Sequence, residues 1–166
     1  PAVVVVNKQQ GLGYTDKLGD RKIGSFGNCA GGTKPWGNVL SAEENFQAQV
    51  PDPVYADGTS FSPDKVPFIL SKGDVFGQGN VFGLAGNKYG WIVEVDPANP
   101  NDYGTKHTWL GRYRHEEVGV RVESGKPLAF YSGFDRRGGQ VYKFVSRVKV
   151  SNPQDKPNSR LLSDGT

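Results

Sequence analysis

The sequence predicts an all-β protein, and three observations lead to this prediction. Glycine (23) and proline (11) together make up about a fifth of the 166 residues, and only 36% of the residues are hydrophobic. Helical periodicity is nearly absent, whereas β-branched and aromatic segments recur between turn residues. The three Trp, seven Tyr and nine Phe residues supply more aromatic surface than a disordered chain carries. Short strands joined by many turns account for all three observations.

Seven segments carry the strand pattern. From Trp91 onward they follow one another about every ten to fifteen residues, as in a meander, and Gly138-Gly139 is a hairpin signal. A sandwich, a barrel and a propeller all give this spacing. The expected strands are Ala2–Val6, Asn38–Ala42, Trp91–Val95, His107–Tyr113, Val118–Val122, Leu128–Ser132 and Gln140–Val148.

The stretch 51–87 differs from the rest because it is rich in proline and glycine and shows little alternation. We interpret it as a long insertion or surface loop, of a length that is usually functional or mobile in compact domains. The chain starts at Pro1 rather than Met, and its last residues, 161–166, resemble a turn that leads into a further strand. We therefore expect residues 1–166 to be a single segment of a larger domain.

Bulk properties exclude several function classes. The net charge of +3 and the pI of about 9.0 indicate a mildly basic protein. The Arg pairs are too short to form the cationic stripe of a nucleic-acid-binding surface. No apolar run approaches the length of a membrane helix. The one cysteine excludes an intrachain disulfide. Small anionic substrates remain possible.

The most informative segment is 28–45, in which a single cysteine, Cys29, is followed by glycines, a Pro-Trp-Gly corner and the pair Glu43-Glu44. A thiolate is a soft ligand and carboxylates are hard ligands, so together they suit iron or neighbouring sites for different metals. Two simpler readings stay open: a buried inert cysteine with a solvated acidic pair, and a helix capping box from Ser41 to Glu44.

Three further groups could carry chemistry. Glu94 and Asp96 lie two residues apart, so a strand would place both on one face, either as metal ligands or as a solvated acidic edge. Arg114 offers a fork for phosphate oxygens, His115 a proton relay and Glu116 a carboxylate, but a charged strand end on the surface also explains them. Asp135 stands in a turn, where Asp is favoured for local reasons.

Common catalytic motifs are absent: there is no Gly-x-Ser-x-Gly, no P-loop and no His-Glu-x-x-His. With two histidines in the chain, a His-rich zinc site is not expected. A metal site here would use mainly oxygen ligands.

Taken together, these segments resemble the PhoX family of bacterial alkaline phosphatases. The Cys-Ala-Gly-Gly, Pro-Trp-Gly and Glu-Glu-Asn strings within 28–45 are the specific part, and weaker matches follow in the family's order at 90–97, 110–118, 131–139 and 142–146. The resemblance implies a six-bladed β-propeller of which this chain holds about three blades. It also implies export to the periplasm or the medium, hydrolysis of small phosphomonoesters, and a cluster of iron and calcium.

The resemblance also implies roles for individual residues. Cys29 would be the thiolate on iron. The carboxylate ligands or their supports would be Glu44 or Glu43, Glu94, Asp96 and Asp135, with Arg114, His115 and Glu116 at the reacting phosphate. One departure weakens the match: the family commonly has Gly-Asp-Asp-Arg where this chain has Gly133-Phe134-Asp135-Arg136, so one carboxylate is missing.

Three hypotheses follow. The chain is part of an active phosphatase, or a non-catalytic propeller relative that binds calcium or an extracellular ligand, or an extracellular carbohydrate- or protein-binding module. For the two propeller hypotheses we expect the rest of the propeller to be the main partner, since open blade edges and faces are unstable alone. Residues 1–166 expressed alone should therefore lack both a cooperative thermal transition and full phosphatase turnover.

Overall fold

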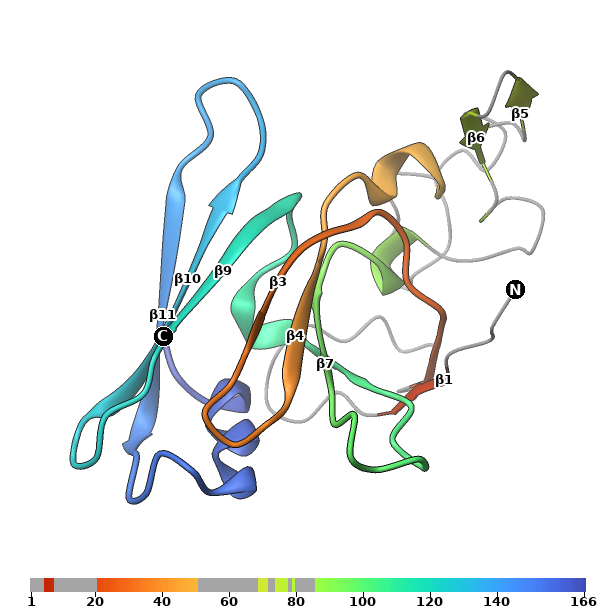
Figure 1. The fold of residues 1–166 in the computed structure, drawn as a ribbon. Coiled ribbons are helices and arrows are strands. Elements are labelled where there is room, and N and C mark those ends of the chain that lie inside the picture. The colour runs from red at the N-terminus through yellow and green to blue at the C-terminus, as the bar shows by residue number, and fades with distance from the viewer. Residues whose placement is uncertain (1–4, 8–20, 51–68, 72–73, 78, 80–85) are drawn as a thin grey trace.

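The computed structural model describes residues 5–7, 21–50, 69–71, 74–77, 79 and 86–166. In these ranges the chain forms antiparallel strands and short 3-10 helices (Figure 1). Two larger sheets pack against one another, and two two-stranded pairs complete the set. No helix in the described part of the chain is long and apolar enough to cross a membrane.

The first sheet has four strands. The Pro35-Trp36-Gly37 corner joins its first two strands, with Gly37 in the left-handed region (φ 92°). Leu40 and Ala42 of the second strand are fully buried, so this strand carries its last residue, Glu43, and the following Glu44 into the interior. In spatial order the strands are β3 (Asn28–Thr33), β4 (Val39–Glu43), β7 (Ile92–Val95) and β8 (Thr105–His107).

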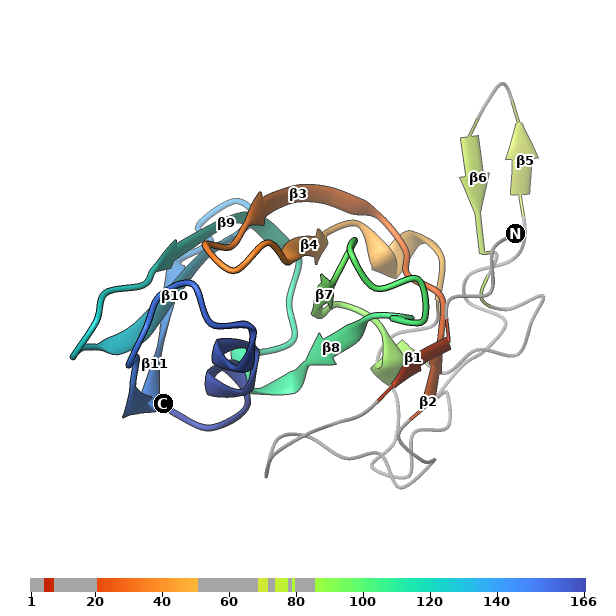
Figure 2. The ribbon, with the colours of Figure 1, turned by 60° about the horizontal axis from the view of Figure 1, so that its bottom comes forward.

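The second sheet is a three-stranded meander with β10 (Pro127–Phe134) between β9 (His115–Arg121) and β11 (Val141–Lys149). After β11 the 3-10 helix η5 (Lys156–Ser163) packs against the sheet, between the two sheets in the view of Figure 2. The chain then returns to pair with β11 through an antiparallel bridge between Ser146 and Gly165.

Shorter elements lie around these sheets. The two-stranded pairs and the remaining 3-10 helices are β1 (Val5–Asn7) with β2 (Arg21–Ile23), β5 (Ile69–Ser71) with β6 (Asp74–Phe76), η1 (Phe46–Ala48), η3 (Gly86–Lys88) and η4 (Thr108–Leu110).

The main core lies between the two larger sheets. Apolar side chains from β4, β7, β10, β11 and η5 meet there, and their burial holds β3 beside β9. The buried members are Trp36, Leu40, Ala42, Ile92, Leu110, Leu128, Phe130, Phe144, Val150 and Leu162. This arrangement brings the N-terminal end of β9 to the ends of β3 and β4, where the candidate site is found.

Several predicted elements differ from the structure. The glycine-rich segment 28–33 is a strand, because β4 pairs with it and β9 lies beside it, neither of which its own composition suggests. The predicted strand His107–Tyr113 is wrong beyond His107, where η4 begins. The capping-box reading is also wrong, since Ser41 lies within β4 and Asn45 is the N-cap of η1. Most of the predicted insertion 51–87 lies outside the described residues.

Candidate functional site

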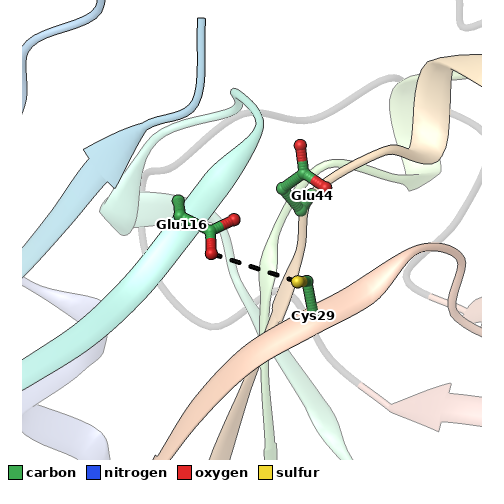
Figure 3. Close-up of side chains that lie close together, drawn as sticks. All are labelled: Cys29, Glu44 and Glu116. Atoms are coloured by element: carbon green, nitrogen blue, oxygen red, sulfur yellow. Dashed lines mark hydrogen bonds between the residues drawn. The ribbon is translucent and has the colours of Figure 1, made fainter.

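Three side chains that are far apart in sequence meet at one end of the first sheet. The Sγ atom of Cys29 and one carboxylate oxygen each of Glu44 and Glu116 all lie within 4.8 Å of one another (Figure 3). The Cys29 thiol donates to Glu116 Oε1 across 4.0 Å. These residues come from the start of β3, the end of β4 and the start of β9. We call them the thiol–carboxylate cluster.

A glycine sets the approach of β3 to β4 at the cluster. Gly27 has a positive φ of 63°, and its carbonyl accepts a hydrogen bond from Glu44 N at 3.0 Å. A Cβ at this position would stand 2.8 Å from the backbone nitrogen of Asn45. No side chain fits at that distance, so glycine is required there for Cys29 and Glu44 to approach each other.

A β-bulge places Glu116. Among the described residues, its neighbour Glu117 is the one non-glycine residue with a positive φ (65°). The register between β9 and β10 shifts between Tyr131 and Gly133. A bulge turns a side chain away from the direction that strict alternation would give it. Strained backbone of this kind is concentrated at functional sites.

Asp135 and Arg114 border the cluster. Asp135 N donates to the Arg114 carbonyl across 3.0 Å, which joins the turn after β10 to the residue before β9. The pKa of Glu44 is raised to about 7, mainly by burial and then by a hydrogen bond to Asp135 and the charges of Asp135 and Glu116, while Arg114 opposes the shift. The pKa of the Cys29 thiol is also raised, first by Glu116 and then by burial, Glu44 and Asp135. Four acidic groups therefore repel one another here.

The donor set fits a bound cation. Glu44 is 2% exposed, and its Oε1 accepts no hydrogen bond from any residue that the structure describes. A buried carboxylate oxygen without a donor, beside other acids, is costly unless a cation faces it. A thiolate together with carboxylates suits iron, and carboxylates alone suit calcium. The residues present thus fit the metals that the sequence resemblance implies.

Glu43 does not belong to this cluster, contrary to the sequence prediction. Its side chain is fully buried on the opposite side of the strand and forms an ion pair with Lys106, whose Nζ lies 2.6 Å from Oε1. Its Oε2 accepts hydrogen bonds from Gly90 N and Trp91 N, both at 2.9 Å. With its lone pairs occupied in this way, Glu43 holds the end of β4 and leaves Glu44 to face the cluster.

Glu94 and Asp96 also lie elsewhere, so the prediction that they point into one cluster with Glu43 or Glu44 is corrected. Glu94 is buried in a network of its own, with His107 Nε2 at 2.7 Å from Oε2. Its Oε1 accepts hydrogen bonds from Ser159 Oγ at 2.7 Å and Asn38 Nδ2 at 3.0 Å. Asp96 Oδ2 accepts a hydrogen bond from Lys156 Nζ. Both acids therefore have hydrogen-bond partners within the protein.

The Glu94 network should stabilise the fold in a pH-dependent way. Burial favours a raised pKa, but the hydrogen bond and charge of His107, with Ser159 and Asn38, lower the pKa of Glu94 from 4.5 to about 2. A lowered folded-state pKa stabilises the protein above the unfolded value, and this stability disappears as pH falls from 4.5 towards 2. Glu94→Gln should therefore lower the thermal midpoint at neutral pH by several degrees and much less in acid. An equal effect at both pH values would contradict this role.

His115 has a structural position rather than one at a reacting phosphate. It is fully buried, with Nε2 at 2.9 Å from the Gly111 carbonyl and Nδ1 at 3.0 Å from Ser132 Oγ. Burial lowers its pKa to about 4. The ring packs against Tyr113 in a tilted arrangement and fixes the start of β9, whose next residue is Glu116.

Sequence reasoning missed Lys106 and His107, the partners of Glu43 and Glu94. Both lie in β8, a three-residue strand that shows no pattern in the sequence. A buried acid requires a buried partner, but nothing in one sequence says which cation supplies it.

The sequence profile described as "Alkaline phosphatase PhoX" matches residues 5–166, almost the whole chain. The chain belongs to the PhoX alkaline phosphatase family. Among solved structures, it is similar to "Pseudomonas fluorescens PhoX in complex with vanadate, a transition state analogue", with 29% identity and a TM-score of 0.70. The match covers 98% of this chain and 30% of the Pseudomonas chain. No curated protein matches the sequence.

These comparisons confirm the resemblance to PhoX and the fold class predicted from it. The chain is a partial β-propeller: its described strands form antiparallel sheets that do not close into a ring. As a PhoX-family member it belongs to a family of phosphatases, and it spans 30% of the length of the Pseudomonas protein.

Proposed function

We propose that this chain supplies part of the active site of a metal-dependent phosphomonoesterase. The observation that carries the proposal is the thiol–carboxylate cluster, in which Cys29, Glu44 and Glu116 converge within 4.8 Å and a buried Glu44 oxygen has no donor in the described part of the chain. Membership of the PhoX family supports the reaction class. The Pseudomonas PhoX structure is a complex with vanadate, a transition state analogue, and this supports an in-line phosphoryl transfer.

The metals proposed are iron and calcium. Cys29 would bind iron, and Glu44, Glu116 and Asp135 would be the carboxylate ligands or their immediate supports. When bound, such cations neutralise phosphate oxygens and stabilise the charge that develops during transfer. The rest of the propeller would supply the remaining ligands, because this chain spans 30% of the Pseudomonas protein.

The chain's own residues would prepare the site in three ways. Arg114 lies close enough to Glu44 to lower its pKa and offers a planar fork for phosphate oxygens. The Glu43–Lys106 pair fixes the end of β4. His115 and Ser132 fix the start of β9 from the buried side. Export to the periplasm or the medium belongs to the same proposal and is tested by fractionating cells that express the full-length protein.

Elemental analysis and a phosphatase assay of the full-length protein test the proposal together. Iron and calcium in a constant ratio, with turnover of p-nitrophenyl phosphate, are the expected result. Calcium without iron and without turnover would favour a non-catalytic propeller relative. Neither metal would favour a binding module and would overturn the proposal.

A further inference from the structure

A hollow of about 460 Å³ lies beside the thiol–carboxylate cluster, and its lining is cationic and aromatic. Among the described residues its lining contains no carboxylate. The lining residues are Arg112, Arg114, Arg136, Phe46, Tyr113, Phe134 and Gln47. We call it the arginine hollow.

The same three chain segments build the hollow and the cluster. Glu44 of the cluster is two residues before Phe46 of the hollow, and Glu116 is two residues after Arg114. Asp135, which borders the cluster, lies next to Arg136. Each segment thus carries an acid within two residues of a lining residue, so the hollow is close to the cluster.

The arginines of the hollow differ in their partners. Arg112 is held by two carbonyls, with Nε at 2.8 Å from the oxygen of Tyr89 and Nη2 at 3.0 Å from that of Gly86. The guanidinium groups of Arg114 and Arg136 lie 6.0 Å and 5.0 Å from the centre of the Phe134 ring. No hydrogen bond or ion pair joins either group to the described residues, so both forks are available to an anion.

A second hollow on the other side of Phe134 has the opposite charge. It measures about 390 Å³, and Glu116, Glu117 and Asp135 are among its lining residues. Because Glu116 and Asp135 are also proposed metal ligands, the metals and the reacting phosphoryl group would lie on this side, and the arginine side would receive a further anionic group. The different linings of the two hollows would therefore give a bound substrate a direction.

We propose that the arginine hollow binds the leaving group of phosphomonoesters that carry a second anionic group, with organic bisphosphates as the substrate class. This inference rests on the proposed phosphatase function. Arg114, next to the cluster, contacts the reacting phosphoryl group, while Arg136 contacts the second phosphate. Two arginine forks on one aromatic ring suit two phosphates, since each fork can bind one in a bidentate way.

The test compares the kcat/KM of the full-length, metal-loaded protein for fructose 1,6-bisphosphate with that for fructose 6-phosphate. A charge-assisted hydrogen bond that is present with one substrate and absent with the other gives a preference of about tenfold. Arg136→Gln should abolish this preference, and Arg136→Lys should restore part of it. Arg137→Gln is the matched control, because it removes the same charge from the adjacent residue, which does not line the hollow.

Two results would overturn the inference: equal kcat/KM values in the wild type, or equal preferences in Arg136→Gln and Arg137→Gln. If the wild-type protein hydrolyses neither sugar phosphate nor p-nitrophenyl phosphate, the proposed function fails instead. Calorimetric binding of fructose 1,6-bisphosphate then decides the inference separately. Binding that is about tenfold weaker in Arg136→Gln than in Arg137→Gln supports it, and equal binding overturns it.

Discussion

Replacing Cys29 by serine is expected to remove iron from the full-length protein and to lower phosphatase turnover by about 100-fold or more. The reason is the loss of the soft ligand. A serine hydroxyl stays protonated at neutral pH and cannot replace a thiolate on iron. The fold should survive, since Cys29 is exposed and takes no part in the buried core. Metal content by elemental analysis, turnover of p-nitrophenyl phosphate and the thermal midpoint of the metal-free protein check these three expectations.

Two adjacent glutamates allow a matched test. It distinguishes a specific role of the cluster in metal binding from a general effect of negative charge at this end of the sheet. Glu116→Gln removes a carboxylate of the cluster, and Glu117→Gln removes the carboxylate of the exposed neighbouring residue. We expect the first to lose metal and activity and the second to keep both. Unchanged iron in Cys29→Ser, or equal losses in the two glutamine variants, would refute the cluster as a metal site.

The second large effect concerns stability. Lys106→Met should destabilise the protein by about 3–5 kcal/mol, because it leaves the Glu43 carboxylate buried without its cation. Lys106 is 1% exposed, and its Nζ also donates to the Lys88 carbonyl at 3.0 Å. Burial lowers the pKa of Lys106, and the charge and hydrogen bond of Glu43 oppose this shift. The measurement is the thermal midpoint of the full-length protein, compared with the exposed Lys126→Met as a control for lost charge.

The double variant Glu43→Gln/Lys106→Met makes the test specific. A neutral amide in place of the carboxylate removes the uncompensated charge, so the double variant should be more stable than Lys106→Met alone. Because Glu43 also holds the end of β4, Lys106→Met should weaken iron binding through Glu44 by about tenfold or more. A double variant as unstable as Lys106→Met would mean that packing, and not charge, dominates at this position.

The all-β class followed from the glycine and proline content, from the near absence of helical periodicity, and from short β-branched and aromatic segments between turn residues. The strands around Leu40, Ile92, Phe130 and Phe144 were predictable because each segment is rich in apolar, β-branched or aromatic residues and is bounded by turn residues. β3 was not, since its run of glycines has no β propensity and becomes a strand through its neighbours. β8 was predicted wrongly for a different reason: a strand of three residues is too short to show a period in the sequence.

At the site, the sequence by itself determined the chemistry, namely one thiol and a short set of acids with few histidines. Only the tertiary structure decided which acids face one another. Glu43 and Glu44 are adjacent and chemically identical, yet strand alternation turns one towards Lys106 and the other towards Cys29. Glu94 found His107, and Glu116 reached Cys29 across 87 residues with the help of a bulge. Such partners are set by strand pairing between distant segments, which depends on the packing of both sheets and is not encoded by local spacing.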